Sequence, residues 1–156
     1  MSAYGRLYEK FILEYYRKEH PEIKASASQI PWDTDDGYRE MLPVMQSDIM
    51  LKQGDKTLVI DAKYYSHTTQ KQYDVNTLHS GNLYQIFTYV KNLDTDSTGN
   101  VSGMLLYAKT DELVLPNNNY KMGGNVISVK TLDLDCDFSM IREQLDGIVQ
   151  SCFEWE

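Results

Sequence analysis

The sequence has few cysteines and no long apolar run, and each shortage excludes a class of protein. Two cysteines, Cys136 and Cys152, are too few for the disulfide framework of a small secreted domain, so we expect thiols without a disulfide. No apolar stretch approaches the roughly 20 residues that cross a bilayer. The first ten residues, MSAYGRLYEK, lack the basic start and apolar stretch of a signal peptide. We therefore expect a cytoplasmic protein without membrane contact.

Positive charge is also scarce, because 15 lysines and arginines stand against 23 acidic residues, for a net charge of -8. A protein that binds nucleic acid alone gains most of its non-specific affinity by neutralising phosphates with basic side chains. Either another module brings such a partner, or the acids cluster where a metal ion neutralises them. The three histidines, His20, His67 and His79, do not have zinc-site spacing with the cysteines, so we expect no structural zinc.

The remaining composition is typical of one globular domain that spans residues 1–156, with 42% hydrophobic and 24% charged residues. The spacing of apolar residues predicts helices over 4–19, 82–92 and 137–152, and strands over 44–52, 57–64, 101–109 and 125–132. We expect Ser80 or Asn82 to cap the second helix. Residues 65–79 read as a loop, and residues 117–119 and 120–124 as turns. This order implies an α/β sandwich around one central sheet.

One predicted hairpin carries the most informative pattern. A turn at Gly54-Asp55 pairs residues whose numbers sum to 109, which places Asp48 opposite Asp61. Because side chains alternate along a strand, one face of the hairpin is apolar. That face carries Ile49, Leu51, Leu58, Ile60 and Ala62. The other face carries Asp48, Met50, Val59, Asp61 and Lys63.

The two opposed aspartates need an explanation. Their carboxylates would lie about 5 Å apart and repel by about 3 kcal/mol at an effective dielectric constant near 20. A divalent cation such as Mg²⁺ or Mn²⁺ would remove that cost, with the Ala62 carbonyl as a further ligand. Lys63, on the same face, could stabilise developing charge or position an attacking water. The alternative is an exposed polar hairpin end in which Asp61 and Lys63 form a surface ion pair.

Asp48 followed by Asp61-Ala62-Lys63 resembles the PD-(D/E)xK signature of metal-dependent nucleases, with Ser47 in place of the proline. Gln85 and Tyr89 are similar to the QxxxY element of one branch of that superfamily. Four-residue spacing puts both on one helix face. The resemblance implies that they orient the site or contact the DNA backbone; taken alone, they would be ordinary half-buried helix residues.

A closer resemblance is to the McrC-type nuclease subunit of 5-methylcytosine restriction systems. Four segments carry it, in the family's order: Leu7-Tyr8-Glu9-Lys10-Phe11, Leu42-Pro43-Val44-Met45-Gln46-Ser47-Asp48-Ile49, Val59-Ile60-Asp61-Ala62-Lys63-Tyr64-Tyr65 and His79-Ser80-Gly81-Asn82-Leu83-Tyr84-Gln85. The resemblance implies a restriction-endonuclease-like fold, with a central mixed β-sheet flanked by helices. It also implies a Mg²⁺-dependent DNA endonuclease in which Mn²⁺ can substitute. A first-helix acid often joins the metal site in this superfamily; Glu9 occupies that position, with Glu14 as the competing candidate.

The same resemblance implies a role in defence, with DNA and a GTP-hydrolysing AAA+ motor subunit as partners. Because a double-strand cut needs two such sites, a dimer on DNA is a further hypothesis. The chain has no GxxxxGK[ST] phosphate loop of its own. It is an excised catalytic domain or a short stand-alone relative. Three other interpretations stay open: a repair or phage-type exonuclease of the same superfamily, a catalytically silent module that binds DNA or a partner, and a simple structural α/β domain.

Overall fold

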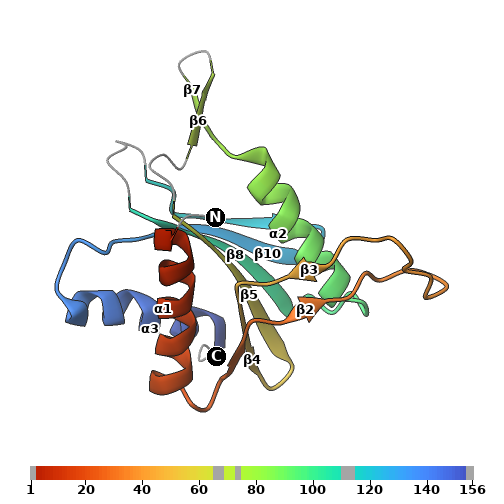
Figure 1. The fold of residues 1–156 in the computed structure, drawn as a ribbon, viewed down its shortest axis with the longest axis horizontal. Coiled ribbons are helices and arrows are strands. Elements are labelled where there is room, and N and C mark those ends of the chain that lie inside the picture. The colour runs from red at the N-terminus through yellow and green to blue at the C-terminus, as the bar shows by residue number, and fades with distance from the viewer. Residues whose placement is uncertain (1–2, 65–68, 73–74, 110–114, 154–156) are drawn as a thin grey trace.

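A mixed six-stranded sheet forms the centre of the fold in the computed structural model, which describes residues 3–64, 69–72, 75–109 and 115–153 (Figure 1). The strand order is β1-β4-β5-β8-β10-β9. β5, β8 and β10 run parallel to one another, whereas β1, β4 and β9 pair antiparallel with their neighbours. The bounds are β1 Lys24–Ser26, β4 Ile49–Gln53, β5 Lys56–Lys63, β8 Val101–Ala108, β9 Asn118–Met122 and β10 Asn125–Leu132.

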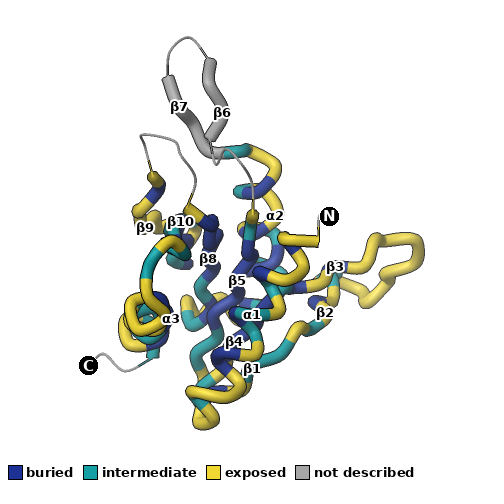
Figure 2. Tube along the Cα trace, turned by 60° about the vertical axis from the view of Figure 1, so that its left-hand side comes forward, coloured by how far each residue is buried: buried dark blue, intermediate teal, exposed yellow. Residues whose placement is uncertain are grey.

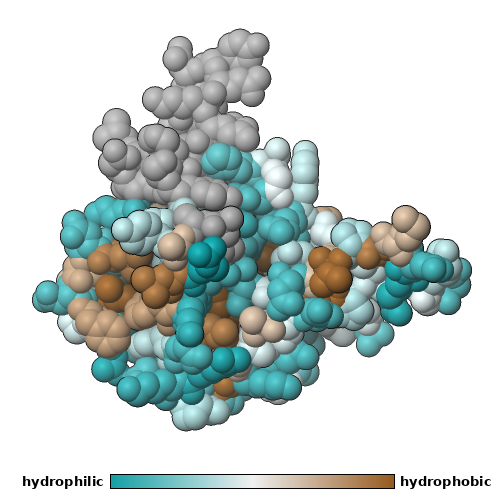
Figure 3. Space-filling model, viewed as in Figure 1, coloured by the Kyte–Doolittle hydropathy of each residue, from teal (hydrophilic) through white to brown (hydrophobic). Residues whose placement is uncertain are grey.

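Helices cover both faces of this sheet, which confirms the expected α/β, restriction-endonuclease-like architecture (Figures 1 and 2). α1 (Ala3–Glu19) and α3 (Phe138–Phe153) pack on one face, where their buried residues share a core with the predicted apolar face of the β4–β5 hairpin. α2 (Ser80–Leu93) packs on the other face, against Met50 and Val59. Apolar side chains also gather on the outside of the α1–α3 layer (Figure 3), where Leu7, Phe138 and Met140 are exposed.

A glycine sets how closely α2 approaches the sheet. A Cβ added at Gly103 in β8 would lie 2.7 Å from Val90 Cγ2 and 2.8 Å from Ile86 Cγ1, both on α2. Contacts that short do not occur between packed carbon atoms, so any larger residue would displace the helix. The position of α2 matters here because this helix also carries Gln85 and Tyr89.

Three predictions about local structure were wrong. Strands β6 (Thr69–Gln72) and β7 (Val75–Leu78) form a short antiparallel hairpin inside the segment 65–79, which was expected to be a loop. Residues 65–68 and 73–74 of that segment lie outside the described residues. Asn118–Met122 is the edge strand β9, so the turn is confined to Gly123 and Gly124, both at positive φ. Four of its five residues are exposed, which removes the apolar alternation that predicts a strand. His79 is the N-cap of α2 and makes no side-chain cap bond, so neither Ser80 nor Asn82 has that role.

The segment between β1 and β4 forms an arm that extends away from the sheet (Figure 1). Its base is a two-stranded antiparallel ladder, β2 (Gln29–Ile30) and β3 (Met45–Gln46). The Trp32 indole Nε1 donates to the Pro43 carbonyl at 2.7 Å and braces the arm across its width. The arm thus leaves Gln46 and the residues after it in a fixed position before β4.

Candidate active site

The β4–β5 hairpin has the predicted register. Its pairs run from Ile49 opposite Ile60 to Gln53 opposite Lys56, and Gly54 in the turn has φ of 63°. Asp48 lies one residue before β4, and its Oδ2 accepts a hydrogen bond from the Ala62 backbone amide at 2.8 Å. The backbone therefore holds Asp48 beside the neighbour of Asp61 and turns both aspartates towards the same cavity.

This cavity has a volume of about 270 Å³ and brings together all of the predicted site residues. α1 contributes Glu9, the hairpin contributes the aspartates and Lys63, and α2 contributes Gln85 and Tyr89. Glu14, the competing candidate on α1, instead forms an exposed ion pair with Arg17 at 3.0 Å. The lining residues are Gly5, Glu9, Gln46, Asp48, Asp61, Ala62, Lys63, Tyr64, Gln85 and Tyr89.

The carboxyl groups are crowded and shielded from water. Asp61 is only 4% exposed, and burial raises its pKa to about 7; the adjacent Asp48 adds to this shift, and the Lys63 ammonium, 3.2 Å from Asp61 Oδ1, opposes it. Burial also raises the pKa of Asp48, with the nearby Glu9 carboxyl contributing in the same direction. A single lysine therefore does not compensate the charge that three ionised carboxylates would place here.

Two carboxylate oxygen atoms indicate which kind of ion this site would bind. Within the described part of the chain, Glu9 Oε2 and Asp61 Oδ2 are buried and have no hydrogen-bond partner. A buried polar atom without a partner is costly, and a hard cation such as Mg²⁺ or Mn²⁺ binds oxygen ligands of this kind. The residues present thus fit a divalent ion. Among the described residues, the acidic, histidine and cysteine side chains do not stand in a group of three or more that could already hold a metal ion.

A hydrogen-bonded row of side chains supports Lys63 from α2. Its Nζ donates to Gln85 Oε1 at 3.4 Å, and Gln85 Nε2 donates in turn to the Tyr89 hydroxyl at 2.9 Å. Burial raises the pKa of Tyr89, with a further contribution from the Asp61 charge, so the phenol remains a neutral hydrogen-bonding group. The four-residue spacing on α2 thus aligns Gln85 and Tyr89 in one hydrogen-bonded row that reaches Lys63, and their functional role stays a prediction.

Sequence reasoning missed three lining residues, Gly5, Gln46 and Tyr64. The two with polar side chains each had a signal. Gln46 lies two residues before Asp48 and so shares its side in an extended chain, and Tyr64 directly follows Lys63 at the end of β5. The Ala62 backbone lines the cavity, and the role of its carbonyl as a ligand stays a prediction.

Residues 4–108 match the family described as "McrBC 5-methylcytosine restriction system component". The chain belongs to this family. The matched range contains every residue that lines the candidate site of this McrBC-family chain, from Gly5 to Tyr89. A relative in Escherichia coli strain K12, the "Type IV methyl-directed restriction enzyme EcoKMcrBC", is 32% identical over 142 residues, which cover 89% of this chain and 40% of the relative. The McrBC-family chain thus spans about two fifths of that relative's length.

These findings confirm the predicted McrC-type relationship. No helix among the described residues has both the length and the apolarity to cross a membrane. Both cysteines lie in described segments, and neither forms a disulfide, as expected.

Proposed function

We propose that this chain is a divalent-metal-dependent DNA endonuclease domain of a modification-dependent restriction system. The observation that carries the proposal is the convergence of Glu9, Asp48 and Asp61 beside Lys63 in one cavity, with two buried carboxylate oxygens that lack a partner. Membership of a restriction-system family supports DNA as the substrate. A purely structural hairpin would gain nothing from this concentration of acids beside apolar strands.

In this proposal Asp48, Asp61 and Glu9, with the Ala62 carbonyl, would hold Mg²⁺, which would supply activation of water and neutralisation of charge on the scissile phosphate. Lys63 directs its ammonium into the same cavity, where it stabilises charge that develops on the phosphate oxygens. Gln85 fixes the position of the ammonium, and Tyr89 fixes Gln85. These two α2 residues act as positioning residues through Lys63.

The partners follow from the family rather than from the site. The E. coli relative is more than twice as long as this chain, so further segments act with a domain of this kind in that protein. We propose that a GTP-hydrolysing AAA+ motor delivers DNA to the site, and that two copies on DNA cut both strands. The acidic balance of the chain supports delivery by another module, because a net charge of -8 disfavours autonomous capture of DNA.

The test is nicking of supercoiled plasmid by the purified chain in Mg²⁺ or Mn²⁺, with EDTA as the blank. We expect Asp61→Ala to abolish nicking and Lys63→Ala to slow it by about 100-fold or more. Lys52→Ala, an exposed lysine on the same hairpin, is the matched control and should leave the rate unchanged. Wild-type nicking retained in either site variant removes that residue from the mechanism.

Two alternative functions give different results. An exonuclease of the same superfamily would degrade linear DNA and spare closed circles. A silent binding module would show no Mn²⁺ binding by calorimetry while DNA binding persists.

A further inference from the structure

Two exposed tyrosines stand at the edge of the candidate active site. Tyr64 lines the cavity directly after Lys63 and is 43% exposed, and Tyr4, in the first turn of α1, is 69% exposed. Their rings stack with centroids 6.0 Å apart and an interplanar angle of 25°. Tyr8 meets the Tyr64 ring edge-on at 5.8 Å, and its own hydroxyl donates to the buried Leu106 carbonyl at 3.2 Å. Tyr64 is therefore fixed by α1 while part of its surface stays open to solvent.

The composition of the cavity indicates a function for the exposed ring of Tyr64. Among the described residues that line the cavity, Lys63 is the only basic side chain, and it already contacts Asp61 and Gln85. The described lining therefore offers few phosphate contacts. Stacking of a nucleobase on an aromatic ring needs no positive charge, and every base offers a face for it.

We propose that Tyr64, backed by Tyr4, is a stacking platform for an unpaired nucleobase next to the scissile phosphate. A paired base in a duplex stacks on its neighbours, so the platform can receive only a base from a single strand, a frayed end or a locally opened duplex. The cavity thus takes DNA whose strands have been separated at the cleavage position. This inference rests on the proposed nuclease function and specifies the substrate of the same site.

The experiment measures binding apart from cleavage. A single-stranded oligonucleotide that carries 2-aminopurine is titrated with the full chain in Ca²⁺, with cleavage checked on a gel, because stacking quenches the fluorescence of this base. A matched oligonucleotide with abasic positions retains the phosphates and removes the bases. The variants are Tyr64→Ala, Tyr64→Phe and Tyr64→Leu, and Tyr38→Ala is the control, since Tyr38 is 66% exposed on the arm and does not line the cavity.

We expect Tyr64→Ala to weaken binding of the normal oligonucleotide by about tenfold and to lose the quenching. Tyr64→Phe should retain both. Wild type and Tyr64→Ala should bind the abasic oligonucleotide equally, and Tyr38→Ala should behave as wild type. In cleavage assays, loss of the platform should raise KM and leave kcat near its wild-type value.

Equal binding of the normal oligonucleotide by wild type and Tyr64→Ala would overturn the proposal, as would an equal loss on the abasic oligonucleotide. If Tyr64→Ala unfolds, Tyr64→Leu decides the question, because it fills the contact with Tyr8 without an aromatic face: binding like wild type contradicts stacking. If wild type does not cleave the single-stranded oligonucleotide in Mg²⁺ or Mn²⁺ while base-dependent binding is intact, the nuclease function is rejected and the platform stands.

Discussion

At the scale of single residues, Asp61 shows that a residue of the candidate site can lower the stability of the folded chain. Burial, with Asp48 adjacent, raises the pKa of Asp61 to about 7, so the folded chain holds this proton more tightly than the unfolded chain does. The folded state therefore loses stability as the pH rises from the ordinary aspartate range, near 4, towards 7. Without a metal ion, an ionised Asp61 destabilises the protein at neutral and alkaline pH.

We therefore expect Asp61→Asn to stabilise the metal-free protein. In EDTA at pH 8, the free energy of unfolding should rise by about 1–2 kcal/mol, because the amide keeps the size of the carboxyl group and removes its charge. Urea denaturation followed by circular dichroism measures this, with Asp55→Asn in the exposed turn as the control. Mn²⁺ should stabilise wild type and not the variant. If the variant is less stable than wild type in EDTA, the ion pair between Asp61 and Lys63 stabilises the fold by more than the burial of the Asp61 charge destabilises it.

The choice between Glu9 and Glu14 shows how far residue-scale prediction can go. The buried stripe of α1 contains Gly5, Tyr8, Ile12, Tyr15 and Tyr16. Glu9 lies one turn after Gly5, within this stripe, whereas Glu14 lies on the opposite side of the helix and is exposed. The buried stripe seen in the structure therefore separates Glu9 from Glu14, whereas the sequence favoured Glu9 only through the family resemblance. Helical spacing could not give the cavity itself, because its walls come from α1, the hairpin and α2.

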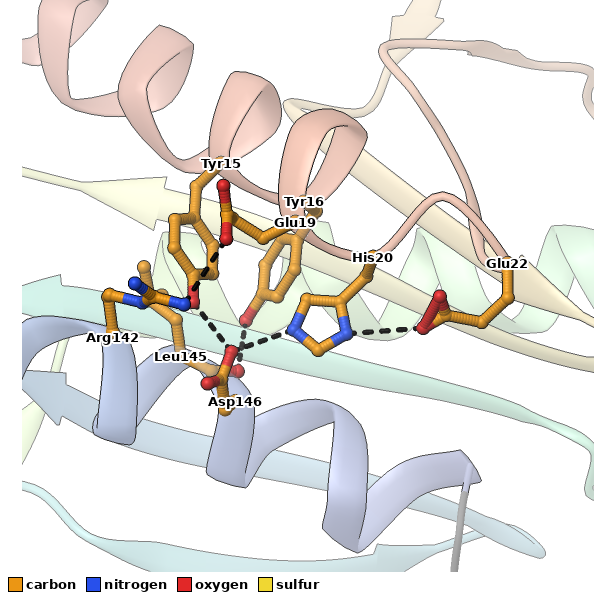
Figure 4. Close-up of polar contacts among 8 residues, drawn as sticks. All are labelled: Tyr15, Tyr16, Glu19, His20, Glu22, Arg142, Leu145 and Asp146. Carbon is orange, nitrogen blue, oxygen red and sulfur yellow. Dashed lines mark hydrogen bonds and ion pairs between the residues drawn. The ribbon is translucent and has the colours of Figure 1, made fainter.

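At the scale of elements, a polar cluster joins the end of α1 to α3 (Figure 4). Asp146 Oδ1 accepts hydrogen bonds from the Tyr15 hydroxyl at 2.6 Å and from His20 Nε2 at 2.7 Å. His20 Nδ1 lies 3.3 Å from Glu22 Oε1, so both ring nitrogens face carboxylates. Only the doubly protonated imidazolium can donate to both. Burial lowers the pKa of His20, but the hydrogen bonds to Asp146 and Glu22 outweigh it and leave the pKa raised.

This cluster predicts a pH-dependent contribution to stability. Because the pKa of His20 is higher in the folded chain than in the unfolded chain, its contribution is fully present below about pH 6.5 and is lost as the pH rises through the folded value. His20→Ala should therefore cost about 1–2 kcal/mol at pH 5.5 and clearly less at pH 8.5. Urea midpoints of wild type and variant across this range measure the difference. A cost of His20→Ala that stays constant across this range would show that the His20 ring stays neutral.

The elements that sequence predicted well share one property, apolar residues in a regular row that the fold buries. α1 buries one stripe and the β4–β5 hairpin has one wholly apolar face, so period and register follow from the residues. β9 could not be found this way, because an exposed edge strand takes its conformation from pairing with β10 rather than from a buried face. The predicted start of α2 was wrong because the N-cap residue is His79, which makes no side-chain capping bond. The parallel pairing of β8 with both β5 and β10 also required the structure.

At the scale of the whole molecule, the charge of the chain is compatible with the proposed cleavage site but disfavours the capture of DNA by the chain alone. The chain carries a net charge of -8, and its candidate cavity has one basic lining residue, Lys63. Affinity for duplex DNA grows with the number of phosphates that basic side chains neutralise. The isolated chain is therefore expected to bind duplex weakly. The E. coli relative has further sequence over about three fifths of its length.

The salt dependence of binding tests this division. For the isolated chain and a fluorescent duplex in Ca²⁺, a plot of log affinity against log salt should have a shallow slope of about -1 to -2, since few counterions are released. Lys63→Ala should flatten that slope by about one, and the exposed Lys52→Ala should leave it unchanged. Fluorescence polarisation across a KCl series gives these values. A slope steeper than about -5 would show that the chain has a basic DNA-binding surface outside the cavity, and delivery by another module would then be unnecessary.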